Sequence, residues 1–106
     1  MINADLLADM GAQSDEAAAF LRTPASGPRL LVLCHLSVAG ELSVGALVER
    51  VGLSQSALSQ HLAKLREQGL VDYRRSAQTL FYRIADDRAA KLLVVLHQMF
   101  CPQLEK

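Results

Sequence analysis

The chain has 106 residues, and its 11 lysines and arginines balance its 11 aspartates and glutamates. This length predicts one domain and excludes the larger Rossmann and TIM-barrel scaffolds. Zero net charge excludes a polybasic protein of the histone or membrane-surface type, and over the whole chain it argues against a DNA-binding protein. Apolar residues make up 51% of the sequence, and a domain this small buries only about two-thirds of its unfolded surface. We therefore expect some apolar surface to be buried against a second copy of the chain.

From the sequence we expect neither a signal peptide nor a membrane span. Residues Met1–Asp5 lack the basic and apolar regions of a signal peptide, and the longest apolar runs are Leu30–Cys34 and Leu92–Leu96. Both runs are much shorter than the ~20 residues that span a bilayer. We expect a cytosolic, membrane-independent protein with a single domain over residues 1–106. In that compartment the two cysteines are core thiols, metal ligands or redox-active groups rather than a permanent disulfide.

The predicted elements begin with two helices. A helix is predicted over Ser14–Arg22, which has a serine N-cap, an acidic first turn and several alanines, and residues 1–13 are predicted to form a flexible arm. The segment Thr23–Pro28 contains two prolines and a glycine and breaks the chain. A second helix is predicted over Pro28–Val38, with Gly40 as its C-terminal cap.

Two further helices follow in quick succession. The first runs from about Ser43 or Val44 to Arg50, and the second runs over Gln55–Gln68, with Ser54 as N-cap and Gly69 as C-cap. A glycine-containing turn separates them, and three leucines recur at helical spacing in the second: Leu58, Leu62 and Leu65. A short helix, a tight turn and a longer helix are typical of the helix-turn-helix motif.

The hydrophobic period then changes. Leu70–Arg75 and Thr79–Ile84 are rich in β-branched, aromatic and arginine residues, and Ser76–Gln78 separates them as a turn, so a β-hairpin is predicted. A last helix from Asp86 or Asp87 to Cys101 is apolar nearly all round, which indicates burial against its own core and a second subunit. The predicted fold is mainly α with a β-hairpin (α+β), a winged helix-turn-helix.

The charge distribution changes the conclusion drawn from the whole chain. Residues 1–40 have a net charge of −2, residues 84–106 are neutral, and residues 54–83 carry five basic and two acidic side chains. Residues 54–83 span the second helix of the pair and the hairpin, and contacts with DNA phosphates need positive charge there. An ordinary solvated helix face holds Glu and Lys, whereas this one is dominated by Ser and Gln, which bond to base edges. We expect these residues to contact DNA: Ser54, Gln55, Ser56, Ser59, Gln60, His61, Lys64, Arg74, Arg75 and Gln78.

Two roles are predicted for His61: a contact with the DNA backbone or a role in packing. Both fit a histidine in this helix better than a metal-binding or catalytic role.

Three strings in the sequence resemble the ArsR/SmtB family of winged helix-turn-helix repressors. They are Gly40–Leu47, Gly52–Leu62 with its Ser-Gln-Ser-Ala-Leu-Ser-Gln-His-Leu run, and Leu65–Val71, and the resemblance continues through the hairpin to cover about residues 29–101. It implies a symmetric homodimer through the first and last helices, and a recognition helix in the major groove of double-stranded operator DNA. It also implies a wing over the neighbouring backbone and an inducer that lowers operator affinity.

The metal sites of this family are incomplete in the sequence. One site needs cysteines around Leu42–Gly45, where there is none. Another uses Asp and His early in the last helix, with His and Glu or His near its end. Here Asp86 or Asp87 is followed by Arg88, and only His97 remains.

The positions of the two cysteines resemble those in a different branch of the family. Cys34 on the second helix and Cys101 at the end of the last lie near the cysteine pair of the BigR/SqrR/HlyU branch, which senses reactive sulfur species or oxidants. The resemblance implies that the reduced protein binds DNA and that a disulfide or polysulfide bridge between the thiols releases it. The alternative that Cys34 is only a buried core residue, as its apolar run also suggests, stays open.

Other functions have weaker support. Cys34, His35, His97 and Cys101 are the candidate ligands of a non-standard zinc site in a metal-sensing repressor. An interaction module that binds no DNA does not explain the basic hairpin. No Cys-x-x-Cys, paired carboxylates, glycine-rich phosphate loop or nucleophile elbow is present, so we expect neither enzymatic activity nor a cofactor.

Overall fold

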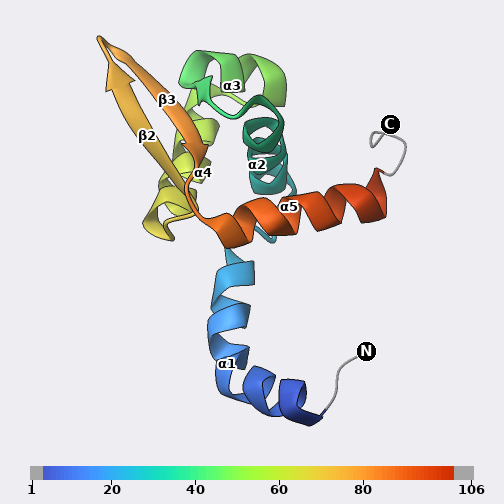
Figure 1. Ribbon diagram of the computed structural model, residues 1–106. Helices are drawn as coiled ribbons and strands as arrows, with labels where there is room; N and C mark the ends of the chain where they lie inside the picture. The colour runs from blue at the N-terminus through green and yellow to red at the C-terminus, as the bar shows by residue number, and fades with distance from the viewer. Residues whose placement is uncertain (1–3, 102–106) are drawn as a thin grey trace.

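The computed structural model describes residues 4–101, which form five helices and one three-stranded antiparallel sheet (Figure 1). The elements, in chain order, are α1 (Ala4–Arg22), α2 (Gly27–Ala39), β1 (Leu42–Ser43), α3 (Val44–Val51), α4 (Gln55–Glu67), β2 (Val71–Ser76), β3 (Thr79–Ile84) and α5 (Asp87–Phe100). The helix-turn-helix and the hairpin fall where the sequence predicts them. No helix in this described part combines the length and apolar character that a membrane span requires.

The core is built mainly from leucines that converge from α2, α3, α4 and α5. The three leucines of the predicted stripe on α4 are fully or almost fully buried, and they meet Leu36 of α2 and Leu93 of α5. Burial of one such side chain contributes about 1.5–3 kcal/mol. This core fixes α4 against α2 and α3, so that the opposite face of α4 is left for solvent or a partner.

Serine caps define the helix-turn-helix. The Ser43 hydroxyl accepts a hydrogen bond from the Ala46 amide at 3.1 Å, and the Ser54 hydroxyl accepts one from the Ala57 amide at 3.1 Å. Between the two helices Gly52 adopts φ 78°, a left-handed conformation that glycine reaches without a steric cost. The predicted cap at Gly69 lies one residue too far along, because α4 ends with Gln68 as its C-cap.

The hairpin is held to the body by a third strand. β2 and β3 pair in a register that sets Tyr73 opposite Tyr82 and Ser76 opposite Thr79. β1 pairs with β3 on its other edge, with Leu42 opposite Tyr82. The sequence did not reveal β1, because a strand of two residues has no periodicity to detect.

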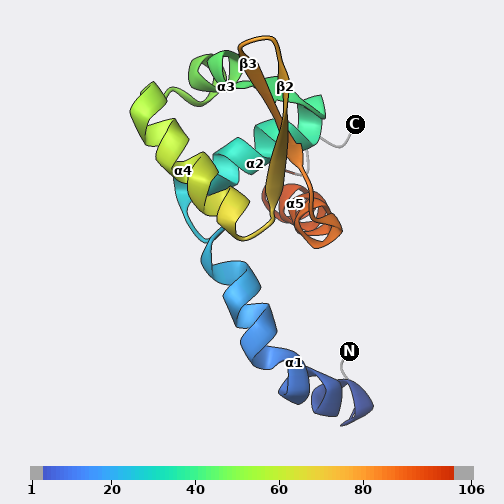
Figure 2. The same cartoon turned by 90° about the vertical axis from the view of Figure 1, so that its left-hand side faces the viewer.

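The two terminal helices differ from their predictions. Helix α1 begins at Ala4 rather than Ser14, so residues 4–13 are helical instead of a flexible arm; residues 1–3 of that predicted arm lie outside the described residues. It projects away from the body of the molecule and buries none of its residues (Figures 1 and 2). Helix α5 is not buried all round, because the body of one chain covers only one of its faces. Ala89 and Leu93 are its buried residues.

Candidate DNA interface and thiol pair

The solvent-facing side of α4 carries the short polar side chains singled out in the sequence. Gln55, Ser56, Ser59, Gln60 and Lys64 are all exposed. None of their side chains takes part in a hydrogen bond or ion pair within residues 4–101. Amide and hydroxyl groups on one helix face, unengaged by the rest of the fold, are suited to base edges in a major groove.

Two predicted contact residues on or next to α4 are engaged by the protein itself. The Ser54 hydroxyl caps the helix. The half-buried His61 accepts a hydrogen bond at Nδ1 from Nε of Arg29 at 3.2 Å, and Arg29 also donates to the Thr23 carbonyl at 3.2 Å. Through this hydrogen bond Arg29 ties α4 to the α1–α2 connection, which gives His61 a structural role, and its contact with the DNA backbone stays a prediction.

The two neighbouring arginines of the hairpin lie in different surroundings. Arg74 donates two hydrogen bonds of 2.9 Å to the Glu41 carboxylate, and its guanidinium lies 4.6 Å over the Phe81 ring. These hydrogen bonds from Arg74 lower the pKa of Glu41 below its usual value. Arg75 is exposed and has no partner of this kind within residues 4–101. Arg75 is therefore the available cation, whereas Arg74 joins the hairpin to the segment before β1.

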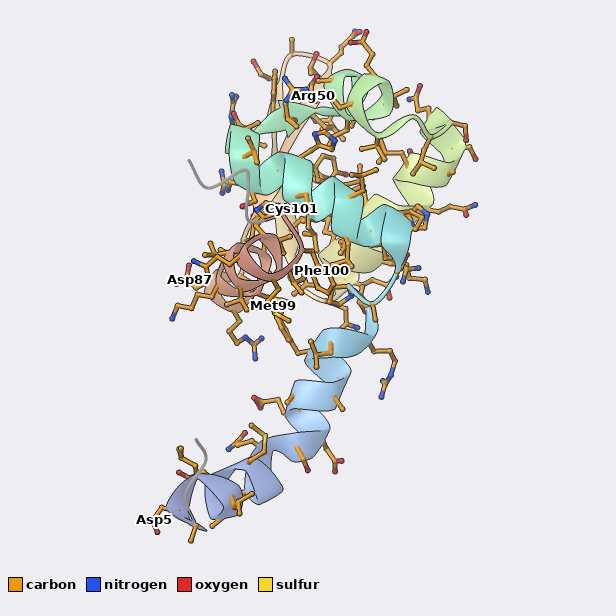
Figure 3. All side chains as sticks on the ribbon, turned by 90° about the vertical axis from the view of Figure 1, so that its right-hand side faces the viewer. Asp5, Arg50, Asp87, Met99, Phe100 and Cys101 are labelled. Carbon is orange, nitrogen blue, oxygen red and sulfur yellow. The ribbon has the colours of Figure 1, made fainter. Side chains whose placement is uncertain are left out.

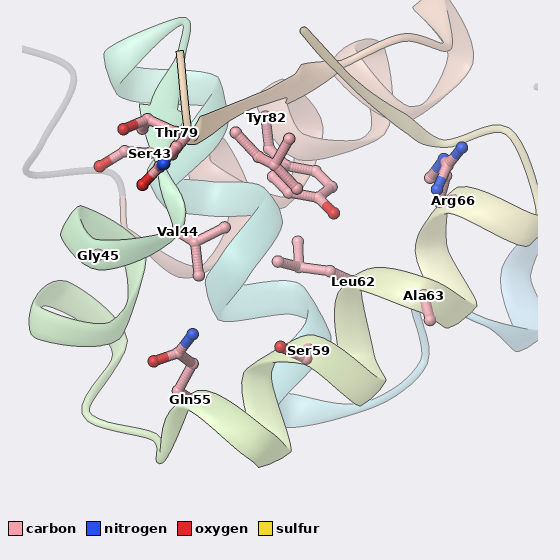
Figure 4. Close-up of a pocket in the computed structure, with 12 residues that line it drawn as sticks. Ser43, Val44, Gly45, Gln55, Ser59, Leu62, Ala63, Arg66, Thr79 and Tyr82 are labelled. Carbon is pink, nitrogen blue, oxygen red and sulfur yellow. The ribbon is translucent and has the colours of Figure 1, made fainter. Parts of the chain in front are cut away.

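A cleft lies between α4 and the hairpin (Figure 4). Gln55, Ser59 and Ala63 form its α4 wall, Gln78 and Tyr82 belong to the hairpin wall, and the start of α3 closes one end. Seven further residues complete the lining: Ser43, Val44, Gly45, Leu62, Arg66, Thr79 and Leu80, of which Arg66 lies at the far end. Most of this lining presents hydroxyl, amide or cationic groups.

Arg66 lines the cleft but is not among the contact residues predicted from the sequence. Its guanidinium lies 4.4 Å over the ring of Tyr73, whose centroid is 5.3 Å from that of Tyr82. Burial raises the pKa of Tyr82, and the positive charge of Arg66 opposes that rise. The charge of Arg66 is evident in the sequence, but its position is not, because Arg66 is aimed at the hairpin by a contact between different elements.

The two thiols lie close enough to influence each other. Cys34 and Cys101 are both free and half-buried, and Cys34 packs against the core. Burial raises the pKa of Cys34, and the negative charge of the Cys101 thiolate raises it further. Figure 3 labels Cys101, the C-cap of α5. Two cysteines that are 67 residues apart in the sequence therefore lie within range of each other's charge in the fold.

The alternative metal site is not assembled. Within residues 4–101 no three His, Cys, Asp or Glu side chains are placed to share a metal ion. Cys34, His35, His97 and Cys101 therefore do not form the tetrahedral set that this alternative requires. Adjacent positions on a helix point about 100° apart, which explains why His35 does not join Cys34.

Together, the helix-turn-helix, the wing and the cluster of exposed polar and basic groups define a winged helix-turn-helix transcriptional regulator. The chain belongs to the ArsR family of bacterial regulatory proteins, whose model matches residues 27–73. It is 45% identical to reduced HlyU from Vibrio cholerae N16961, over 88% of this chain and 97% of that one, with a TM-score of 0.82.

Two other solved structures are similar. The transcriptional repressor BigR from Xylella fastidiosa is 42% identical, over 88% of this chain and 94% of that chain, with a TM-score of 0.82. The homodimeric winged helix-turn-helix DNA-binding domain of Mb0332 from Mycobacterium bovis is 32% identical, over 90% of this chain and 87% of that chain, with a TM-score of 0.74.

Proposed function

We propose that this protein is a repressor whose operator affinity is controlled by the thiols of Cys34 and Cys101. The reduced form binds double-stranded operator DNA through α4 and the wing. The form in which a disulfide or polysulfide joins the two thiols releases it. The observation that supports this proposal is that the charge of Cys101, at the end of α5, acts on Cys34 of α2, so the two oxidisable groups lie within range of each other's charge.

The DNA-bound form is proposed to be a symmetric homodimer built on α1 and α5. Large apolar side chains on these helices are exposed in the single chain, among them Leu21, Val95 and Phe100. The M. bovis relative is homodimeric, and a two-fold dimer presents two recognition helices to two half-sites about one helical turn apart.

The chemistry of the bridge is thiol–disulfide exchange. One cysteine thiolate attacks the outer sulfur of a low-molecular-weight persulfide, takes that sulfur and releases the donor's thiol. The second thiolate attacks the inner sulfur of the new protein persulfide, forms the S–S bond and expels hydrosulfide. Both cysteines are oxidised, the transferred sulfur is reduced, and the two thiol protons pass to the products. A bridge that retains extra sulfur atoms spans a longer distance.

Release requires that the bridge favour one of two packings of the dimer. Helix α2 carries Cys34 and also Arg29, which donates a hydrogen bond to His61 of α4. A shift of α2 on bridging would therefore also move the recognition helix.

The test compares operator affinity before and after thiol modification. The operator is first selected from random duplexes with reduced protein. We expect treatment with glutathione persulfide to weaken binding by about 5- to 150-fold, the usual range of coupling between two sites. Intact mass should show either the loss of two hydrogens or a gain of sulfur. A reductant should restore both mass and affinity.

Serine variants provide the control. Cys34→Ser and Cys101→Ser should each bind the operator as well as the reduced wild type and lose the response to persulfide. Equal affinity of the reduced and bridged wild type would refute control by the thiols, and a full response from Cys34→Ser would refute the two-cysteine mechanism.

A further inference from the structure

We propose that Arg88, in the first turn of α5, is a positioning residue that fixes the direction of α1 and so prepares the chain for dimerisation. Arg88 and its three partners, Asp86, Glu16 and Phe20, are called the Arg88 clamp. The inference rests on the proposed homodimer and adds to it the residue that sets the angle between its two helices. Arg88 acts through Phe20 and Glu16 of its own chain and not through a contact with the second copy.

Helix α1 needs to be held in place, because it lacks a packed face along most of its length. It projects away from the body, and none of its residues is fully buried (Figures 1 and 2). Phe20, near its C-terminal end, is half-buried and packs against the core. A helix of 19 residues is about 28 Å long, so a tilt of about 10° at one end moves the other end by about 5 Å. The contacts around Phe20 therefore decide where the rest of α1 lies.

The guanidinium of Arg88 is held in place within α5 itself. Its Nε donates a hydrogen bond to Oδ1 of Asp86 at 3.2 Å, and its Nη2 donates one to Oδ2 at 2.9 Å. Asp86 is the N-cap of α5 and also accepts a hydrogen bond from the backbone amide of Arg88 at 2.8 Å. A planar guanidinium that binds both oxygens of a carboxylate has little freedom to turn. Arg88 is thus oriented without any help from α1.

The oriented guanidinium makes two contacts with α1. Its carbon lies 4.8 Å from the centroid of the Phe20 ring, which is within the range of a cation–π attraction. Its Nη1 lies 3.9 Å from Oε1 of Glu16, and no other ion pair among residues 4–101 reaches α1. Glu16 and Phe20 are four residues apart, so they share one face of the helix. Because the ion pair is long and exposed, the ring contact is the main part of the clamp.

The Arg88 clamp leaves another face of α1 free for the second copy. Leu21 follows Phe20 and points about 100° away from it around the helix. It is exposed and lines an apolar groove that continues past Pro24 to Leu92 and Leu96 of α5. The groove joins the two helices of the proposed dimer, so its shape depends on the angle between them. A surface that is ordered before association loses less freedom on binding and binds more tightly.

The first experiment measures the dimer dissociation constant of the reduced protein by sedimentation. Arg88→Gln should raise this constant by about 5- to 30-fold, because a dimer contains two clamps and each loses an exposed cation–π contact. Arg88→Lys keeps a cation near the ring and should give a smaller increase. Lys91→Gln removes the same charge from an exposed position one turn further along α5 and should leave the constant unchanged. Circular dichroism should show the wild-type helix content in all three variants.

A double-mutant cycle tests whether Arg88 acts through Phe20. Phe20→Leu keeps an apolar side chain against the core and removes the ring. In this background Arg88→Gln should change the dissociation constant by about twofold or less. Full additivity of the two substitutions would show that Arg88 does not act through the ring and would overturn the clamp.

A distance measurement tests the direction of α1 itself. With both native cysteines replaced by serine, spin labels are attached at Ala12→Cys on α1 and Glu49→Cys on α3, two exposed positions. Labelled chains are mixed with an excess of unlabelled chains, so that each dimer holds one pair of labels. We expect a narrow distribution of distances between the two labels. It should broaden or shift in Arg88→Gln and stay unchanged in Lys91→Gln.

The outcomes separate this inference from the proposed function. Weaker dimerisation of Arg88→Gln with an unchanged distance distribution would make Arg88 a direct interface residue and overturn the clamp. A broader distribution with an unchanged dissociation constant would overturn its role in dimerisation. In both cases the proposed dimer and the control of operator binding by the thiols would stand. A reduced wild type that remains monomeric on the operator would refute the proposed dimer and this inference together.

Discussion

Cys34 illustrates how burial sets the reactivity of one residue. Its pKa lies above the ordinary thiol value, first because burial disfavours the thiolate and second because Cys101 bears a like charge. At neutral pH the thiol form of Cys34 therefore predominates more strongly than in a free cysteine. Since the thiolate is the nucleophile, the raised pKa slows the reactions of Cys34 at neutral pH relative to those of a free cysteine.

The rate of Cys34 alkylation should show this pH dependence. In the reduced wild type, iodoacetamide labelling followed at the Cys34 peptide should accelerate with rising pH, with a midpoint above that of free cysteine. In Cys101→Ser the midpoint should move down, because the like charge is gone. An unchanged midpoint would show that the two thiols are not electrostatically coupled.

The ion pair with Glu41 limits how freely Arg74 can bind DNA phosphates. Glu41→Gln removes the carboxylate that binds this arginine and should release it toward phosphates. We expect stronger binding to mixed-sequence DNA and a salt slope steeper by about 0.9 for each additional phosphate that is neutralised. Glu49→Gln on α3 removes an equal charge from a side chain outside the ion pairs among residues 4–101. The same increase in both variants would rule out a specific release of Arg74.

At the scale of single residues, the sequence predicts which side chains are exposed but not their long-range partners. The periodicity of α4 correctly separates buried leucines from the exposed Gln55 and Ser59. It does not reveal that the partner of His61 lies 32 residues away or that the partner of Arg74 lies 33 residues away. These pairs depend on how the elements pack, which no local spacing encodes.

Among the elements, the wing contains a strained turn. Ala77 adopts φ 57°, a left-handed conformation that costs a residue with a Cβ roughly 1–2 kcal/mol. Ala77→Gly should therefore raise the free energy of unfolding by about 0.5–1 kcal/mol, the gain being reduced by the greater freedom of glycine in the unfolded chain. Chemical denaturation measures it. Gln78→Gly, at a position without positive φ, should lower stability instead, and a gain in both variants would contradict the explanation.

Helices and strands are predictable from the sequence where several local signals coincide. α4 has an N-cap serine and a leucine stripe, and it was predicted to within one residue at its end. Helix α1 was predicted to start too late because Ser14, which resembles a cap, lies in its interior. There its hydroxyl donates to the Gly11 carbonyl, a common alternative for serine within a helix.

At the scale of the whole molecule, α5 supplies the most direct test of assembly. Met99 is 64% exposed and Phe100 is 73% exposed, which is unusual for large apolar residues unless a second chain covers them. In a dimer that covers this end of α5, Met99→Glu would bury one unpaired charge from each chain. It should raise the dimer dissociation constant by about 100-fold or more.

Sedimentation and operator binding measure that change together. Gln98→Glu, at an already polar and exposed neighbour, is the matched control and should remain dimeric. A Met99→Glu variant that stays dimeric at the same concentrations would remove this end of α5 from the interface.

The aromatic cluster of the wing also has an optical consequence. The chain has two tyrosines and no tryptophan, and both tyrosines lie in that cluster, with Arg66 over one of them. Tyrosine emission from the protein therefore originates in the wing, on a different part of the fold from Cys34 and Cys101. A change in tyrosine emission when those thiols are oxidised in the absence of DNA would report, without any label, that a chemical event at the sulfurs has reached the wing.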